Sequence, residues 1–178
     1  MPTPTLRTDR LLLEPYQPAD AEDFVALLAD PEVGRFMGDG PLTVADATDL
    51  FGRVFSRVYA DDLFDVWAVR RDGRYIGHAE IKRTDDVEGH ELVYALARPA
   101  WGGGLGTELA TALVRYGFNR LDLPRVYATV ADANHASLGL LAKLNFVHQQ
   151  DVTEADGSVT QVLALDRDTD PAGSPRSS

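Results

Sequence analysis

The sequence lacks three features, and each absence excludes a class of protein. None of its 178 residues is cysteine, which excludes disulfides, thiolate metal ligands and a cysteine nucleophile. No apolar run approaches the length that a transmembrane helix needs, so we expect no membrane-spanning role. Residues 1–10 also lack the apolar core of a signal peptide. The absence of cysteine fits a cytoplasmic protein.

Basic residues are scarce relative to acidic ones. There are 17 lysines and arginines against 28 aspartates and glutamates, for a formal net charge of −11. Such a charge repels phosphate backbones and anionic lipids, so we expect neither nucleic acid nor a membrane surface as a partner. It favours cationic partners such as a protonated amine, although the same charge could serve solubility alone.

Length and composition predict one domain. A chain of 178 residues that is 44% hydrophobic can bury one core. The predicted domain covers residues 1–166. Residues 167–178 are rich in Asp, Pro, Gly and Ser and are expected to form a disordered tail.

Hydrophobic periodicity predicts an α/β fold. Apolar and β-branched runs predict strands, and amphipathic spacing predicts helices, one stopped at Asp30-Pro31 and another capped by Thr43. The strands are expected over residues 10–16, 64–69, 75–82, 91–97, 125–130, 146–152 and 159–165, and the helices over residues 18–30, 43–58, 105–116 and 134–144. Their sum is a mixed, mostly antiparallel sheet of about seven strands flanked by about four helices.

A glycine-rich loop joins a predicted strand to a predicted helix. Gly102, Gly103, Gly104 and Gly106 stand directly before the helical pattern. Backbone N–H groups without side chains can approach an anion closely, and a helix N-terminus favours negative charge. The loop fits neither the dinucleotide pattern G-x-G-x-x-G nor the nucleotide pattern that ends in Gly-Lys. It therefore predicts a phosphate site of another kind, or a flexible turn.

Two motifs carry a family resemblance. The first is ELVYALARPAWGGGLGTE at residues 91–108, and the second is NHAS at residues 134–137 followed by KLNF at residues 143–146. Together they resemble the GNAT N-acetyltransferase superfamily, in particular the branch with the ribosomal-protein alanine N-acetyltransferases. Trp101 stands where many members have Gln or Arg. Asn145 follows the helix predicted over residues 134–144, where a left-handed residue is expected, and replaces a usual glycine. Residues 7–13 and Ile76-Gly77 are similar to the family's opening strand and hairpin, so the resemblance spans most of the chain.

The resemblance implies acetyl-CoA as co-substrate and a sheet with a splayed central strand pair. The segment that matches the family's pyrophosphate-binding loop comprises Gly102, Gly103, Gly104, Leu105, Gly106 and Thr107. The segment that matches the pantetheine-binding strand comprises Ala95, Leu96 and Ala97. Asn134 matches a position that contacts the coenzyme A arm, although asparagine is equally suited to capping the following helix.

The chemistry of the implied transfer requires a base and an acid. A protonated amine cannot attack a thioester until it loses a proton. Glu91 is the first candidate base, because it matches a family glutamate and shares strand parity with Val93 and Ala95. It could equally be a solvated carboxylate at a strand end. His78 and Glu80 share one face of the preceding strand and are alternatives, although polar alternation on a half-exposed strand is ordinary; His90 has the opposite parity to Glu91.

Ser137 is the family-matched candidate for protonating the departing thiolate. A serine in the first turn of a helix is also an ordinary structural residue. Tyr94 and Tyr127 are the alternative acids. Without cysteine no thiol-bound acyl-enzyme can form, which favours direct attack of the amine in a ternary complex. The resulting prediction is an acyl-CoA-dependent N-acetyltransferase that acts on a protein N-terminus or a small amine.

The sequence leaves several questions open. A non-catalytic GNAT-fold domain that binds or senses acyl-CoA is the alternative reading. The four histidines lack the close spacing of metal ligands, so no metal cofactor is expected. Residues 30–62 are expected to shape the acceptor side, but they identify no particular amine. The acyl chain length and the oligomeric state are also open.

Overall fold

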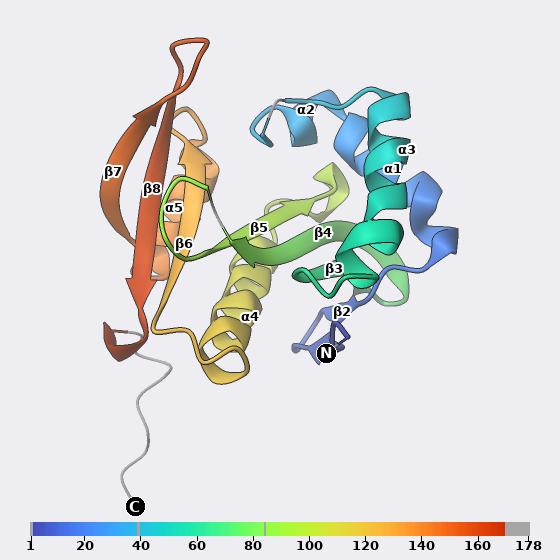
Figure 1. Ribbon diagram of the computed structural model, residues 1–178, viewed down its shortest axis with the longest axis horizontal. Coiled ribbons are helices and arrows are strands. Elements are labelled where there is room, and N and C mark those ends of the chain that lie inside the picture. Colours follow the sequence, from blue (N-terminus) through green and yellow to red (C-terminus); the bar gives the residue numbers. More distant parts are fainter. Residues whose placement is uncertain (1, 39, 84, 170–178) are drawn as a thin grey trace, which may run out of the picture. The chain divides into compact units, whose positions relative to one another are not determined.

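The computed structural model describes residues 2–38, 40–83 and 85–169 (Figure 1). The chain forms two compact units. The first comprises Met1–Lys82 with Val93–Leu109, and the second comprises Arg83–Leu92 with Ala110–Ser178. Strand β5 (His90–Leu96) and helix α4 (Leu105–Asn119) each begin in one unit and end in the other.

The first unit is an antiparallel sheet accompanied by short helices. Strand β2 (Leu12–Glu14) pairs with β1 (Leu6–Arg7) and with β3 (Asp65–Arg71), and β3 pairs with β4 (Arg74–Arg83). The β3–β4 hairpin turns at residues 72–73. The α-helices of this unit are α1 (Ala21–Ala29), α2 (Pro31–Gly34) and α3 (Val44–Arg53).

Caps fix where the helices of the first unit begin. The Thr43 side chain accepts a hydrogen bond from the N–H of Asp46, which confirms the predicted cap of α3. Asp30 ends α1 as predicted, but its carboxylate also accepts from the N–H groups of Glu32 and Val33 and begins α2. Pro31 suits this first helical position because its missing N–H would have no partner there.

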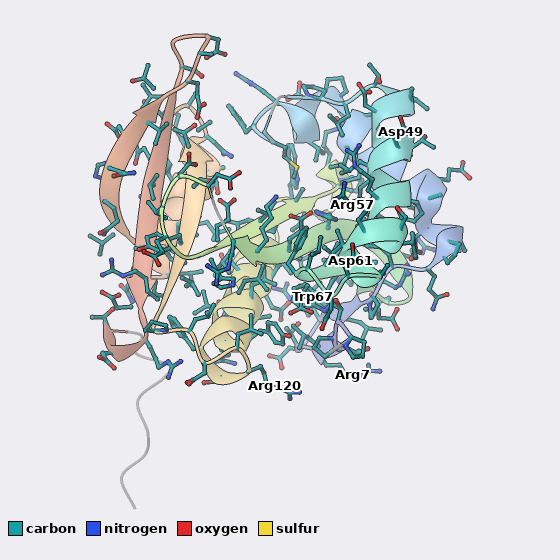
Figure 2. The ribbon with its side chains drawn as sticks, viewed as in Figure 1. Arg7, Asp49, Arg57, Asp61, Trp67 and Arg120 are labelled. Carbon is teal, nitrogen blue, oxygen red and sulfur yellow. The ribbon has the colours of Figure 1, made fainter. Side chains whose placement is uncertain are left out.

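Helix α3 continues into a π-helical turn, Val54–Tyr59. In Figure 2, Asp49 of α3, Arg57 of this turn and Asp61 just after it follow one another, and all three are exposed. The opposite stripe is apolar, and Ala47 and Val54 are buried.

The core of the first unit is aromatic. The rings of Phe24 and Phe51 lie edge-on to Tyr16, at centroid distances of 5.4 and 5.6 Å. Such edge-to-face contacts add to the area that these rings bury. Trp67 is fully buried, and its indole N–H donates to the carbonyl of Pro4 at 2.6 Å (Figure 2).

The second unit contains an antiparallel hairpin and a third strand. Strand β8 (Val159–Asp166) pairs with β7 (Val147–Thr153) and with β6 (Arg125–Ala131). Residues of β6 alternate between buried and half-buried, as expected for a sheet with one covered face. Helix α5 (His135–Lys143) ends before Asn145, whose φ of 68° confirms the predicted left-handed residue.

The predicted α/β class is confirmed. Hydrogen-bonded neighbours follow the order β1-β2-β3-β4-β5-β6-β8-β7. The pairs β1–β2, β2–β3, β3–β4, β6–β8 and β7–β8 are antiparallel, and the pair β5–β6 is parallel. The described residues contain eight strands and five α-helices, against about seven and about four predicted from periodicity. The two-residue strand β1 and the four-residue helix α2 are too short to produce a periodic pattern. The splayed strand pair stays a prediction.

The ordered chain continues beyond the expected domain end at residue 166. Arg167–Thr169 form a 3-10 helix, and the Arg167 guanidinium donates to the carbonyl of Leu123 and to the carboxylate of Asp122. Residues 170–178 of the expected tail lie outside the described residues. Within the described part of the chain, no helix is long and apolar enough to cross a membrane.

Candidate functional site

The glycine loop has the backbone conformation that its composition predicts. Gly102 and Gly104 have φ values of 81° and 78°, a region that residues with a side chain rarely adopt. Gly103 lies between them, and a Cβ added there would meet no atom within 4 Å. The exposed loop leads directly into the 15-residue helix α4, which begins at the buried Leu105. The first backbone N–H groups of such a helix have no helical partner.

Two side chains hold this loop in place. Arg10 donates through Nη1 to the carbonyl of Gly103 at 2.8 Å and pairs through Nε with Glu108 at 3.1 Å. Trp101 donates its indole N–H to the carbonyl of Leu96 at 2.7 Å, although half of its surface is exposed. The loop is therefore tied both to the opening segment of the chain and to the end of β5. A tryptophan can fix this corner where the family often has Gln or Arg.

The end of β5 lies against β4 at a glycine. The N–H of Ala97 donates to the carbonyl of Ile76 at 2.8 Å. A Cβ added to Gly77 would stand 2.4 Å from the carbonyl oxygen of Ala95 and 2.8 Å from a methyl carbon of Leu96. Only glycine fits this approach without a shift of the strand. Ala95, Leu96 and Ala97, which are predicted to bind the pantetheine arm, thus belong to the same unit as the glycine loop.

Glu91 is a buried carboxylate in the second unit. Its residue is 9% exposed, and Thr129 Oγ1 donates to Glu91 Oε2 at 2.6 Å. The pairing of Glu91 with Tyr127 in the parallel β5–β6 ladder brings Thr129 of β6 within reach. This burial excludes the alternative that Glu91 is a solvated carboxylate at a strand end. Its role as a base stays a prediction.

Asn134 caps helix α5. Its Oδ1 accepts from the N–H of Ser137 at 3.2 Å, so the capping role is confirmed. The cap uses the amide oxygen, and the Nδ2 group is not part of it. Ser137 stands in the first turn of α5, where the sequence expects it. The contact of Asn134 with coenzyme A and the proton donation by Ser137 stay predictions.

A buried hydrogen-bonded chain of side chains runs through the first unit. Tyr75 Oη lies 2.9 Å from Tyr16 Oη, which lies 2.8 Å from His78 Nδ1. His78 Nε2 lies 2.9 Å from Glu80 Oε1, and Lys82 Nζ lies 3.1 Å from Glu80 Oε2. His78 is 3% exposed, and the two alternative bases of the sequence analysis, His78 and Glu80, both belong to this hydrogen-bonded chain. The tyrosines carry no local sequence signal, because Tyr16 follows β2 and Tyr75 lies in β4, and only the tertiary fold brings them together.

The charges in this chain are set by burial and pairing. Burial alone would raise the pKa of Glu80, but the interactions with His78, first of all its hydrogen bond, and the charge of Lys82 lower it to about 2. Burial raises the pKa of Tyr16 and of Tyr75 above the ordinary tyrosine range. Glu80 is therefore a carboxylate, and both tyrosines are neutral hydroxyls, at physiological pH.

A hollow of about 380 Å³ in the first unit reaches one end of this chain. It is lined by Asp23, Ala26, Leu27, Asp30, Val33, Tyr75, Ala97, Arg98 and Pro99. The charged residues of the lining are two carboxylates and one guanidinium, and Arg98 Nε pairs with Asp30 at 2.9 Å. Slight burial would raise the pKa of Asp30, but hydrogen bonds from two backbone N–H groups and the pairing with Arg98 lower it. The lining thus favours a cation, and Ala97 belongs to the predicted pantetheine segment.

Of the remaining candidates, His90 and Tyr127 belong to the second unit and Tyr94 to the first. His90 is half-buried, and burial, followed by the charge of Arg83, lowers its pKa. Tyr127 of β6 stacks under Arg125, with 5.9 Å from the guanidinium carbon to the ring centroid. Tyr94 is half-buried on β5. Among the described residues, no group of three or more histidine, aspartate or glutamate side chains could hold a metal ion.

Comparison with known proteins identifies the family. The family model described as "Acetyltransferase (GNAT) domain" matches residues 10–147. The chain belongs to the GNAT acetyltransferase family. This GNAT chain is 32% identical to an uncharacterized N-acetyltransferase p20 of Bacillus licheniformis over 165 residues, which cover 89% of this chain and 92% of the relative.

Solved structures share the GNAT fold. The spermidine N-acetyltransferase of Vibrio cholerae, in complex with CoA and spermine, aligns with a TM-score of 0.77 at 16% identity and covers 89% of this chain and 96% of its own. A ribosomal L7/L12 alpha-N-protein acetyltransferase in complex with coenzyme A aligns with a TM-score of 0.75 at 12% identity, over 92% of this chain and 98% of its own. At these identities the likeness shows the fold, which agrees with the resemblance that the two motifs carry.

Proposed function

We propose that this GNAT chain is an acetyl-CoA-dependent N-acetyltransferase that acts on a primary amine. The observation that carries the proposal is the glycine loop before α4. Its two left-handed glycines, the open space over Gly103 and the fixation by Arg10 and Trp101 together suit an anion bound by backbone N–H groups. Membership of the GNAT family indicates that this anion is the pyrophosphate of coenzyme A.

The cofactor arm would follow the end of β5. Ala95, Leu96 and Ala97 would offer backbone groups to pantetheine, and Gly77 keeps that backbone close to β4. Backbone groups of Gly102, Gly103, Gly104, Leu105, Gly106 and Thr107 would hold the pyrophosphate. We also propose that the Nδ2 group of Asn134 contacts the coenzyme A arm, because the cap of α5 uses only the amide oxygen.

The transfer would proceed by direct attack in a ternary complex. The amine nitrogen forms a bond to the thioester carbon, the carbon–sulfur bond breaks, and the thiolate of coenzyme A takes a proton. Glu91 is the proposed base, and Ser137 is the proposed donor to the thiolate. Thr129 would hold the Glu91 carboxylate through its 2.6 Å hydrogen bond, so that the carboxylate is oriented while buried.

A binding experiment tests the cofactor half of the proposal. A ligand that binds the folded state alone stabilises it by RT ln(1 + [L]/Kd), about 2.7 kcal/mol at a hundredfold excess over Kd. Coenzyme A should therefore raise the melting temperature of the protein, whereas ATP and NAD at equal concentration should not. An equal rise with all three would show a general phosphate site instead. The Gly103→Ala variant tests the loop itself. Its added methyl group would meet no protein atom within 4 Å, so the fold should persist while the methyl group crowds the proposed anion.

A further inference from the structure

Tyr75 belongs to two features of the first unit at once. It lines the hollow of about 380 Å³, and its hydroxyl begins the hydrogen-bonded chain to Tyr16 and His78. The hollow is also lined by Ala97, which belongs to the proposed pantetheine segment, and by two carboxylates against the single guanidinium of Arg98, a net negative lining that favours a cation. An ammonium group in this hollow would therefore lie at the open end of a buried chain.

The partners of His78 fix the direction of the hydrogen bonds. Glu80 is a carboxylate and can only accept, so His78 Nε2 carries a hydrogen and donates to Glu80 Oε1 at 2.9 Å. In a neutral imidazole the other nitrogen, Nδ1, is then an acceptor. Tyr16 donates its O–H to this nitrogen, and Tyr75 donates its O–H to the oxygen of Tyr16. The lone pairs of Tyr75 Oη are left to accept from a donor in the hollow.

We propose that Tyr75, Tyr16 and His78 form a proton relay that deprotonates the acceptor ammonium before it attacks the thioester. The ammonium passes a proton to Tyr75 Oη, Tyr75 passes its own proton to Tyr16, and Tyr16 passes its proton to His78 Nδ1. Each hydroxyl ends as it began, the amine becomes neutral, and His78 becomes an imidazolium. This inference rests on the proposed function. Tyr75 is the residue that touches the substrate, and Tyr16 and His78 act through it.

The charged neighbours of the chain suit this step. The imidazolium would lie 2.9 Å from the buried carboxylate of Glu80, which stabilises its positive charge, while Lys82 pairs with the other carboxylate oxygen. The acidic groups Asp20 and Asp23 act on Tyr75 together with Arg70. Apolar rings cover the rest, since Phe24 lies edge-on to both His78 and Tyr16.

The relay and Glu91 account for different protons. An ammonium that becomes an amide nitrogen loses two protons, one before attack and one from the positively charged nitrogen of the tetrahedral intermediate. The relay takes the first proton, and Glu91 is proposed for the second. Loss of the relay should therefore be compensated by any condition that supplies the amine already neutral.

The experiment compares three tyrosine-to-phenylalanine variants. Tyr75→Phe and Tyr16→Phe break the relay, whereas Tyr59→Phe is the matched control. Tyr59 Oη also lies in this core, but it donates to the carbonyl of Val66 and accepts from the N–H of Tyr16, both at 2.8 Å, and takes no part in the chain. The readout is kcat/KM for thiol release between pH 7 and pH 10 with an alkyl primary amine.

The expected losses depend on pH. An alkyl amine with a pKa of about 10.4 is neutral in only about 1 molecule in 2,500 at pH 7. Both relay variants should therefore lose activity about 100-fold or more at pH 7, the size of a general-base effect, and return to within about threefold of wild type at pH 10. The hydroxyls persist over this range, because burial raises the pKa of Tyr16 and Tyr75 and raises that of Tyr59 to about 12. Tyr59→Phe should show no such recovery with pH.

A second acceptor sharpens the test. The α-amine of a peptide has a pKa of about 7.7–8.0, so roughly one molecule in ten is already neutral at pH 7. If the protein acetylates such a peptide, kcat/KM of the relay variants should fall at most about tenfold with this acceptor. A loss of equal size at every pH and with both amines, or one that Tyr59→Phe reproduces, would refute the relay.

One readout is independent of activity. Nitrogen-15 NMR of the imidazoles should show neutral His78 with its hydrogen on Nε2, and a hydrogen on Nδ1 would overturn the relay. If the wild-type protein releases thiol with none of the amines tested, the proposed function fails. If it releases thiol with an amine and the relay variants match its rate at pH 7, the function stands and the relay fails.

Discussion

Replacing Gly77 with alanine tests the packing of β4 against the predicted cofactor strand. The added Cβ would stand 2.4 Å from the carbonyl oxygen of Ala95 and 2.8 Å from a Leu96 methyl carbon. Real Cβ atoms do not approach backbone oxygen so closely, and a backbone atom cannot rotate away as a side chain can. The end of β5 must therefore move. Overpacking of this kind costs about 1–3 kcal/mol.

The expected shift in melting temperature follows from this cost. For a domain of 150–250 residues, 1 kcal/mol corresponds to about 2–4 °C, so Gly77→Ala should melt about 2–12 °C below wild type. It should also bind coenzyme A more weakly, because the displaced backbone at Ala95 belongs to the predicted pantetheine segment. Differential scanning fluorimetry with and without coenzyme A measures both effects.

A matched substitution controls for the loss of glycine itself. A Cβ at Gly52, in the exposed face of α3, would meet no atom within 4 Å. Alanine is favoured over glycine within a helix, so Gly52→Ala should leave the protein as stable as wild type or up to about 1 kcal/mol more stable. An unchanged melting temperature in Gly77→Ala would refute the close approach of β4 and β5 on which the site description depends.

Three further predictions concern the loop and the two buried carboxylates. Gly103→Ala should keep the wild-type melting temperature, because its Cβ meets no atom within 4 Å, but it should weaken coenzyme A binding measured by calorimetry. An unchanged affinity would contradict the proposal that the anion binds at this loop. Glu91→Gln keeps a hydrogen-bond acceptor for Thr129. This variant should lower kcat about 100-fold or more with little change in coenzyme A affinity. Unchanged turnover between pH 6 and pH 9 would eliminate Glu91 as the base. Because folding lowers the pKa of Glu80 from 4.5 to about 2, its ionised form stabilises the protein above about pH 4.5 by at most roughly 3 kcal/mol, and this contribution disappears as the pH falls towards 2. The stability difference between wild type and Glu80→Gln in urea denaturation should shrink over the same range, and a constant difference would contradict the pairing with His78.

Much of the fold could be predicted from the sequence, because local signals determine it. The caps at Thr43 and Asn134 and the left-handed Asn145 follow from residue chemistry at a helix end. Strand β6 matches the strand predicted over residues 125–130 from an apolar and β-branched run. The sequence did not predict helix α2, because Asp30-Pro31 is a signal that ends a helix, and here the same two residues also begin the next one.

The site could be predicted only in part. The composition of residues 102–106 predicts the glycine loop. The hydrogen bond by which Trp101 holds the loop is local, because its acceptor, the carbonyl of Leu96, is only five residues away. The contacts of Arg10, by contrast, span 93 and 98 residues. The tyrosines of the relay lie 59 residues apart and are joined by the tertiary fold alone. Periodicity placed His78 and Glu80 on one strand face, but their partners decide that they are buried and paired rather than solvated.

The most direct test of the account is thiol release from acetyl-CoA in the presence of a panel of alkyl amines, polyamines, amino acids, aminoglycosides and N-terminal peptides. The account predicts release with at least one class of primary amine, together with an acetylated product in mass spectrometry. If no amine of the panel causes thiol release, while coenzyme A still raises the melting temperature of the protein, the result would contradict catalysis. It would favour a domain that binds or senses acyl-CoA.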